Sequence, residues 1–334
     1  NYTLENERTD NGLLARRGKM ASGFRTRYSD SASAYLEERY THGDVPSGLM
    51  HSTGVKLVAF DKLNLGANLD LGTLKDPYTS AELERTALGV SAGYGIDKVK
   101  IASALEYRID NIEDPYTASF SKRTSWLLKN SLKYKLSEDW RLIGKFNYAV
   151  SESSKGDYYN GDYTEAFVGY AYRPVQNDRL NALLKYTYFY NLPTTDQLTG
   201  SNTASDYIQR SHIGSIDVMY DLTPSWTVGG KVAYRFAQVA QDRENPEYFD
   251  SRAQLCVVRA DWHFVHRWDV LIEGRWLDLP DAQDSRSGVL LGIYRQLGNH
   301  IKVGGGYNFS DFSDDLTQLD YKYQGLFINV IGKF

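Results

Sequence analysis

Basic side chains stand at even spacing in several segments of this 334-residue chain. Arg141 and Lys145 are four residues apart, as are Lys231 and Arg235. Residues an even number apart lie on the same face of an extended strand. Such a face would favour anions or an acidic polymer, because rings of Arg and Lys set the selectivity of a pore. We take these residues as the predicted basic wall: Arg141, Lys145, Lys185, Lys231, Arg235, Arg259 and Arg275.

Acidic residues at the same spacing leave a second interpretation open. Asp261, Asp269 and Glu273 share the phase of Arg259 and Arg275. Opposite charges on neighbouring strands stabilise a sheet, so these residues could pair with one another instead of binding a solute.

Sequence signals for an enzyme are weak. The six histidines, at 42, 51, 212, 263, 266 and 300, belong to no nucleophile elbow, HExxH motif or phosphate loop. His263 and His266 flank an expected tight turn, where a polar residue needs no catalytic explanation. We therefore predict no catalytic residue and no enzymatic activity.

Metal and cofactor signals are weak as well. Cys256 is the one cysteine, so neither a disulfide nor a Cys/His zinc site is expected within the chain. The acidic run at 310–320 could hold Ca²⁺ or bridge lipopolysaccharide through it, although a solvated loop is the simpler explanation. We predict no metal site and no cofactor. Gly304, Gly305 and Gly306 indicate a bend, a bulge or a close backbone approach.

Composition points to strands. The chain has 26 Tyr, 13 Phe and 6 Trp against 8 Pro, a balance that suits pleated surfaces. No stretch is long and apolar enough for a membrane helix. The formal net charge of -4 gives no sign of a nucleic-acid-binding surface.

Strict apolar–polar alternation recurs along nearly the whole chain. Leu63, Leu65, Ala67, Leu69 and Leu71 are one example, with polar or small residues between them. This period predicts about eighteen strands, with sixteen as an alternative. We expect them near 1–9, 15–28, 31–41, 49–60, 63–74, 85–95, 99–110, 123–136, 139–151, 164–173, 179–190, 210–222, 225–237, 252–264, 268–278, 286–295, 299–309 and 321–334.

The expected connections alternate between tight turns and longer polar loops, such as 111–122, 191–209 and 238–251. Short periplasmic turns and longer extracellular loops are typical of a transmembrane antiparallel up-and-down β-barrel. A soluble sandwich also alternates, but its strands are usually shorter than the 10 to 14 residues expected here. The fold class is therefore all-β, with one barrel domain over 1–334 that could be the C-terminal part of a longer chain.

Aromatic residues near the expected turns support the barrel. Rings at headgroup level form girdles around membrane barrels. Phe60 is out of phase with the rest of its strand. The predicted girdle comprises Tyr94, Tyr134, Trp140, Tyr172, Tyr220, Trp226, Trp262, Trp268 and Tyr294.

The chain ends in YQGLFINVIGKF, with Leu326, Ile328, Val330 and Phe334 in one phase. This segment resembles the C-terminal strand of bacterial outer-membrane proteins. The resemblance implies that the barrel-assembly machinery reads these four residues as an assembly signal, and that the protein resides in the Gram-negative outer membrane.

A second resemblance concerns the segments RADWHFVHRWDVLIEGRWLDLPD and GGYNFSDFSDDL. They look like the barrel at the C-terminal end of very large Gram-negative surface proteins. This resemblance implies an architecture but no activity.

The functional expectations follow from the barrel. Eighteen strands leave an aqueous interior unless something fills it. A pore or conduit with a cation-lined lumen is one hypothesis, and an anchor or translocator barrel with a plugged lumen is another. A rim-located enzyme is a third. Expected partners are outer-membrane lipid, lipopolysaccharide, the assembly machinery and a plug, an upstream domain or a periplasmic protein. The loops are modest in length, so none is expected to fold inward.

Overall fold

The structure, a computed structural model, describes residues 2–8, 14–43, 46–60, 62–77, 80–114, 119–176, 178–191, 207–265, 267–298, 301–312, 316 and 324–332. Eighteen strands make up nearly all of it, with two single-turn 3₁₀ segments, η1 (Asp157–Tyr159) and η3 (Pro280–Ala282). The strands are β1 (Tyr2–Arg8), β2 (Leu14–Ser29), β3 (Ala32–Gly43), β4 (Ser47–Phe60), β5 (Leu63–Lys75), β6 (Glu82–Gly95), β7 (Val99–Asp114), β8 (Ser119–Lys135), β9 (Trp140–Ser153), β10 (Tyr163–Tyr172), β11 (Leu180–Tyr190), β12 (Ile208–Thr223), β13 (Trp226–Ala240), β14 (Phe249–Val265), β15 (Trp268–Leu279), β16 (Asp284–Leu297), β17 (Ile301–Asn308) and β18 (Gly325–Gly332).

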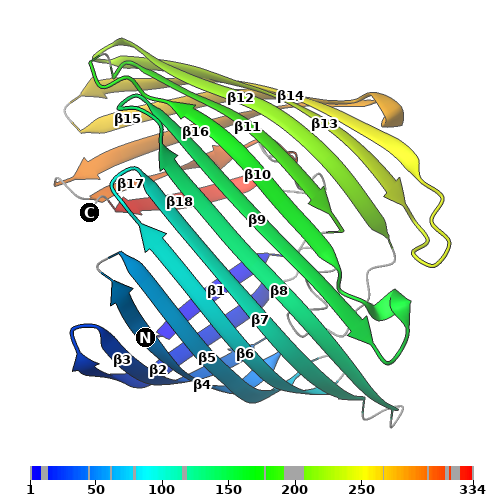
Figure 1. Ribbon diagram of the computed structural model, residues 1–334. Coiled ribbons are helices and arrows are strands. Elements are labelled where there is room, and N and C mark those ends of the chain that lie inside the picture. Colours follow the sequence, from blue (N-terminus) through cyan, green and yellow to red (C-terminus); the bar gives the residue numbers. More distant parts are fainter. Residues whose placement is uncertain are drawn as a thin grey trace.

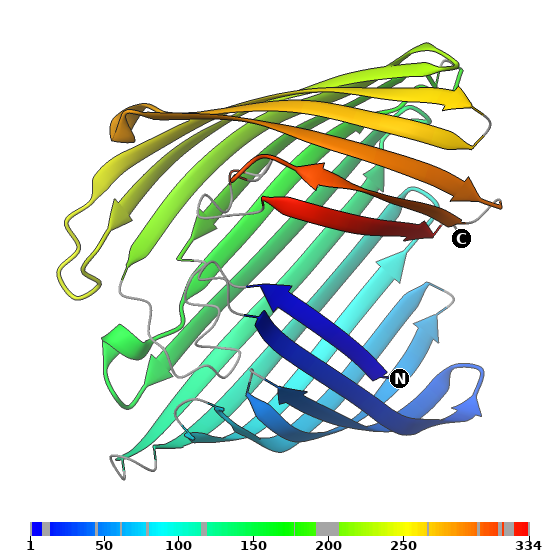
Figure 2. The same ribbon diagram turned by 180° about the vertical axis from the view of Figure 1, so that it is seen from behind.

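The strands form one antiparallel, up-and-down sheet that curls around an interior (Figure 1). Each strand pairs with its neighbours in the chain, from β1 with β2 to β17 with β18. Within the described residues no ladder joins β1 to β18, and Figure 2 shows the two strands facing each other across a gap. The curled sheet is therefore open along one seam.

The alternation in the sequence becomes two faces of the sheet. In β13, Val232 and Tyr234 are exposed on the outer face, at 62% and 46%. Ala233 and Arg235 lie between them and are buried on the inner face, at 3% and 4%. The same period in the other strands puts apolar side chains outside and most charges inside.

The two ends of the strands differ, as expected. Connections such as 30–31, 61–62 and 224–225 are tight, whereas 154–162 and 191–207 at the opposite end are long. We call these the turn end and the loop end. Several strands continue further toward the loop end than the sequence predicts, and β8 has 17 residues. Since about 9 to 11 residues cross a bilayer, such strands are long enough to extend beyond it.

Bulges occur where several strands enter the tight turns. The pairing of β4 with β5 shifts register between Val58 and Phe60, and similar shifts occur near Ser29, Thr223 and Val265. An extra residue on one strand reverses the phase of the side chains that follow. The bulge explains why Phe60 is exposed although it is out of phase with its strand.

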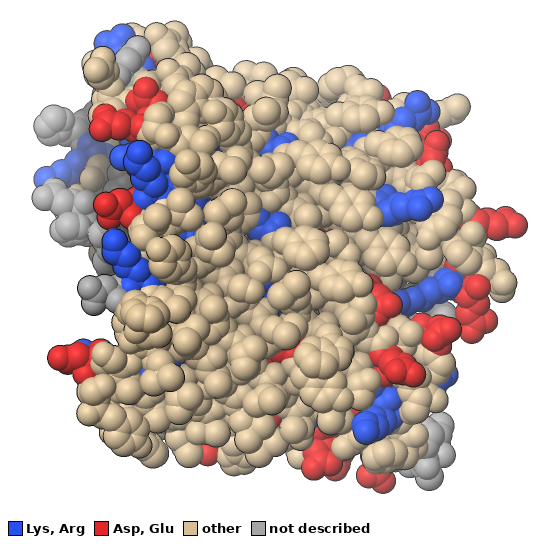
Figure 3. Space-filling view, viewed as in Figure 1, with Lys and Arg blue, Asp and Glu red and all other residues tan. Residues whose placement is uncertain are grey.

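The outer face carries a broad uncharged area. In Figure 3, Lys, Arg, Asp and Glu gather mainly toward the two ends of the strands and are sparse between them. Exposed apolar residues from many strands make up this area, among them Leu88, Val168, Ile216, Val258 and Ile272. An apolar band flanked by polar margins is typical of a surface that faces lipid.

The interior differs between its two halves. Toward the loop end, three buried apolar clusters line the inner face, and the largest spans β11 to β15. Toward the turn end, the wall of β2 to β10 is hollowed by a cavity of about 1050 Å³. No helix in the described part of the chain has the length and hydropathy to span a membrane.

Candidate functional site on the inner wall

The inner wall of β11 to β15 carries an apolar patch near the loop end. We call it the inner apolar patch, and its members are Phe189, Ile213, Ala233, Ala253, Leu255, Val257 and Leu277. All are at most 5% exposed, although they lie on the face that surrounds the lumen. An apolar surface on a wet wall becomes buried only when something covers it.

The covering residues come from the segment that follows β17. Phe312 and Leu316 are 1% and 2% exposed and belong to the same cluster as the inner apolar patch. Ser310 reaches the inner wall at Gly288, where a Cβ would lie 2.1 Å from the Ser310 Oγ. The expectation that no loop folds inward is therefore wrong.

We call the segment after β17 the inward segment; the structure describes its residues 309–312 and 316. Two arginines hold it by its backbone. Arg235 Nη1 donates to the Leu316 carbonyl at 3.4 Å, and Arg275 Nη1 donates to the Phe312 carbonyl at 3.3 Å. Arg235 also donates to Gln209 Oε1 at 2.9 Å, and its guanidinium lies 5.5 Å from the centre of the Phe189 ring. Both residues belong to the predicted basic wall, but here they fix a loop.

A charge network continues from Arg275 along the wall. Glu273 accepts from Arg275, and the Arg259 guanidinium lies 3.6 Å from Glu273 and 3.3 Å from Asp217. These side chains are between 7% and 28% exposed. The pairing interpretation therefore holds for Arg259 and Arg275, because their charges are balanced by inward acids.

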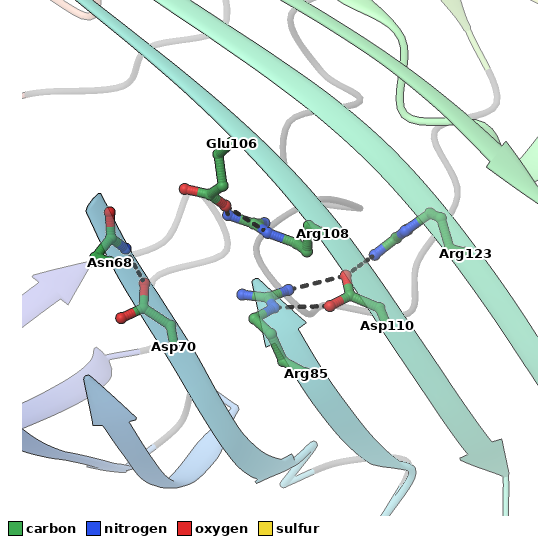
Figure 4. A network of polar contacts seen from close by, with 7 residues as sticks. All are labelled: Asn68, Asp70, Arg85, Glu106, Arg108, Asp110 and Arg123. Carbon is green, nitrogen blue, oxygen red and sulfur yellow. Dashed lines mark hydrogen bonds and ion pairs between the residues drawn. The ribbon is translucent and has the colours of Figure 1, made fainter. Parts of the chain in front are cut away.

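A second network crosses β6, β7 and β8 (Figure 4). Arg85 donates to both oxygens of Asp110, at 2.7 and 3.0 Å, and Arg123 donates to one of them at 3.3 Å. The three residues are direct partners in the sheet register, and Asp110 is fully buried. Neither Arg85 nor Arg123 is among the predicted site residues, since both lie where the strands were expected to begin.

Loops meet at the loop end. Arg243 donates to the Asn160 carbonyl at 2.5 Å, and Asn191 donates to the Asp162 carbonyl at 3.1 Å. Burial raises the pKa of Asp162, while the backbone N–H of Ser151 opposes this rise by donating to its carboxylate. Connections 154–162 and 241–248 therefore touch, and this contact narrows the loop end.

The turn half of the interior is basic and open. The cavity of about 1050 Å³ there is lined by small residues and by Arg25, Arg27, Lys56, Lys129, Lys133 and Lys145. Asp30 is the one acid in this lining, and it pairs with Arg27. Lys145 is held by Glu165 at 2.8 Å.

The predicted basic-wall residues all lie on the inner face, but in different surroundings. Lys145, Arg259 and Arg275 form ion pairs with acids, and Arg235 is buried beneath the inward segment. Lys185 lies over the Phe167 ring, with its Nζ 5.3 Å from the ring centre. Arg141, at the turn end, is exposed.

All the predicted girdle residues but one lie on the outer face of the sheet. Trp140 stacks with Tyr170, and Trp226 stacks with Trp262, on the outer face. Tyr94, Tyr134, Tyr172, Tyr220 and Trp268 share that face by their strand phase. The prediction for Tyr294 is wrong, because its ring is 8% exposed on the inner face.

The reason lies in β16 and β17. Val289, Leu291 and Ile293 are the exposed apolar set of β16, so Tyr294 has the opposite phase. Gly304 makes room for the ring, since a Cβ there would lie 2.1 Å from Tyr294 Cδ1. The glycine run thus marks a close approach of a side chain to the backbone.

The C-terminal signature is described in part. Leu326, Ile328 and Val330 are 86%, 86% and 65% exposed on the outer face of β18. Phe334 lies outside the described residues, as does most of the acidic run at 310–320. In the part of the chain that is described, no group of three or more His, Cys, Asp or Glu could hold a metal ion.

No protein-family model and no curated protein matches this sequence. Solved structures share its fold. The siderophore receptor PirA from Acinetobacter baumannii has a TM-score of 0.58 at 8% identity, over 98% of this chain and 64% of that one. The ferric-catecholate import receptor Fiu from K12 E. coli gives 0.56 at 8%, over 92% and 66%.

The alcaligin outer membrane receptor FauA from Bordetella pertussis has a TM-score of 0.53 at 11% identity, over 92% of this chain and 62% of that one. The chain thus spans just under two thirds of the length of each of these three structures. At such identities the likeness shows the fold, which is that of outer-membrane receptor barrels and agrees with the expected location. It gives no support to the resemblance to very large surface proteins.

Proposed function

We propose that residues 1–334 form a single membrane-spanning barrel domain in the Gram-negative outer membrane that conducts solutes through its interior. The observation that carries this proposal is the sidedness of the sheet. Apolar residues such as Val232, Val258 and Ile272 cover the outside, while charged residues and a cavity of about 1050 Å³ occupy the inside. The fold shared with import receptors supports transport over catalysis.

In a bilayer, the open edges of β1 and β18 require partners, because unpaired backbone groups in lipid cost several kcal/mol each. We propose that these two edges pair with each other there. Lipid and lipopolysaccharide then contact the outer face. The assembly machinery reads Leu326, Ile328 and Val330 together with Phe334.

The proposed path is narrow at one end and basic at the other. The inward segment and the touching loops restrict the loop end. Lys129 and Lys133, which form no ion pair with any residue that the structure describes, make the turn half of the path cation-lined. Such a lining favours anions.

The alternative is an anchor barrel whose interior is filled by another polypeptide. One observation favours it, since the inner apolar patch already binds a chain segment through Phe312 and Leu316. A filled interior would leave no path for ions.

Single-channel recording of the purified full chain in planar bilayers separates the two functions. Stable openings with a reversal potential displaced toward the anion equilibrium would support the conduit. Absence of current from a barrel shown to be folded by circular dichroism would overturn it and favour the anchor.

A further inference from the structure

The pairing of β7, β8 and β9 brings like charges directly together near the turn end. Lys100 is the register partner of Lys133, and Lys135 is the register partner of Arg141. All four lie on the inner face, because Ile101, Tyr134 and Leu142 alternate with them on the outer one. Lys129 also faces inward on β8, two inward positions from Lys133, and it extends the group. We call these five residues the basic strip: Lys100, Lys129, Lys133, Lys135 and Arg141.

The basic strip has no internal compensation. Among the described residues, none of its side chains makes a hydrogen bond or an ion pair, and all five are exposed. Asp97, Glu138 and Asp139 in the adjoining turns form no ion pair with them, and Asp139 instead accepts from the Val175 backbone N–H at 2.7 Å. By contrast, Lys145 on the same wall is paired with Glu165, and Arg85 and Arg123 share Asp110.

Like charges placed directly opposite each other destabilise a sheet. The basic strip therefore lowers the stability of β7 to β9 unless a negative group lies between its members. On an ordinary exposed surface, such lysine side chains would turn toward water and move apart. Here the wall is concave, and the facing strands contribute Arg25 and Lys56 to the same cavity, so separation is limited.

The cavity beside the strip has room for a ligand. Its floor consists of small inward residues, including Ser91, Gly93, Ala102, Ala104 and Ser131, between Lys129 and Lys133 and the facing cations. Its volume of about 1050 Å³ lies slightly above the usual range of small-molecule sites. Lysine presents a point charge on a flexible stem, so such a group recognises the number of negative charges more than their geometry.

We propose that the basic strip and the cavity beside it form a binding site for small polyvalent anions, meaning solutes with two or more phosphate or carboxylate groups. This inference deepens the proposed function by naming the class of solute that the interior accepts. Lys129 and Lys133 contact the ligand from the wall, while Lys100 and Arg141 neutralise its outer charges. Binding removes the repulsion between Lys100 and Lys133, and it therefore stabilises the barrel.

The test is isothermal titration of the refolded full chain in detergent at low ionic strength, with inorganic pyrophosphate, citrate and chloride as separate ligands. We expect pyrophosphate or citrate to bind and chloride to show no saturable binding. The double variant Lys100→Gln, Lys133→Gln should bind about tenfold or more weakly, the loss of at least one charge-assisted contact. Pyrophosphate alone would indicate phosphate solutes, and equal binding of both would indicate recognition by charge number.

Lys122→Gln is the matched control, because Lys122 lies on the same strand but on the outer face. Its affinity should equal that of the unchanged chain. Equal affinities of the double variant and the control, or no binding of either polyvalent anion to the unchanged chain, would overturn the proposal.

Thermal unfolding provides a second readout that does not depend on ligand affinity. Without ligand, the double variant should unfold at a higher temperature than the unchanged chain, because the repulsion is gone. Pyrophosphate should raise the unfolding temperature of the unchanged chain but not that of the double variant, and a rise of equal size in both would contradict the site. Binding without current in bilayers would overturn conduction alone, whereas current without binding would overturn this site alone.

Discussion

Asp110 balances the charges of two arginines in the most enclosed part of the inner wall. It is fully buried between Arg85 and Arg123, and its contact with Arg85 uses both carboxylate oxygens. Removing one member of a buried ion pair leaves a charge without compensation, which costs far more than the pair contributes.

Asp110→Asn should therefore lower the free energy of unfolding by about 3 to 5 kcal/mol. Urea unfolding of the refolded barrel in detergent measures the change. Glu82→Gln is the control, since Glu82 forms an exposed pair with Lys75 and should cost about 1 kcal/mol or less. Similar losses in the two variants would show that the buried network does not stabilise the wall.

The inward segment is the element that the residues of β11 to β15 hold inside the barrel. Phe312 and Leu316 fill the inner apolar patch, and truncating each to Ala removes about 2 to 5 kcal/mol of packing. Arg235 and Arg275 would then hold the segment only through its carbonyls.

We expect the double variant Phe312→Ala, Leu316→Ala to show larger single-channel conductance than the unchanged chain, because the segment leaves the lumen. Phe309→Ala is the matched control, since Phe309 is 50% exposed and contacts Tyr307. If the double variant and this control conduct equally, the segment does not restrict the path.

The last strand provides a second prediction at the element scale. Ile328 is exposed on the outer face of β18 and its neighbour Asn329 faces inward. A lysine facing lipid near the bilayer midplane costs about 2 to 4 kcal/mol, whereas the lumen tolerates charge.

Ile328→Lys should accordingly reduce the yield of folded barrel in outer-membrane fractions much more than Asn329→Lys. The folded fraction is read from heat-modifiable mobility on gels. Equal yields would place Ile328 away from lipid and remove the support for an assembly signal on this face.

The strands were predictable because each carries its own alternating pattern, as from Leu63 to Leu71. The register between neighbouring strands was not predictable, since it depends on hydrogen bonds between strands of similar pattern. The direct alignment of Arg85, Asp110 and Arg123 appears only once β6, β7 and β8 are paired. The sequence puts Tyr294 on the wrong face, because aromatic rings mark the outer phase in most strands, whereas Val289, Leu291 and Ile293 mark it in β16. The burial of Phe312 and Leu316 depends on a patch assembled from five strands, which no local pattern reveals.

At the scale of the whole molecule, the interior divides into a loop half that apolar side chains and the inward segment narrow and an open turn half lined by basic residues. Three apolar clusters and the inward segment occupy the first, and the cavity of about 1050 Å³ occupies the second. A solute entering from the loop end would therefore meet a constriction before it meets the lysines.

The even strand number fixes which side of the membrane each end of the chain reaches. β18 finishes at the turn end, and β1 starts beside Met20, partway along β2, and runs toward the loop end. N and C therefore lie on the same side in Figure 2. In intact cells, an epitope added before Asn1 or inserted at 136–139 should be hidden from antibodies, and one inserted at 241–248 should be accessible. Antibody labelling of the first two epitopes without permeabilisation would show that the turn end faces the outside of the cell. Because the strand number is even, a polypeptide fused to either terminus lies in the same compartment as the turn end and its lysines. Such a polypeptide does not have to cross the membrane itself.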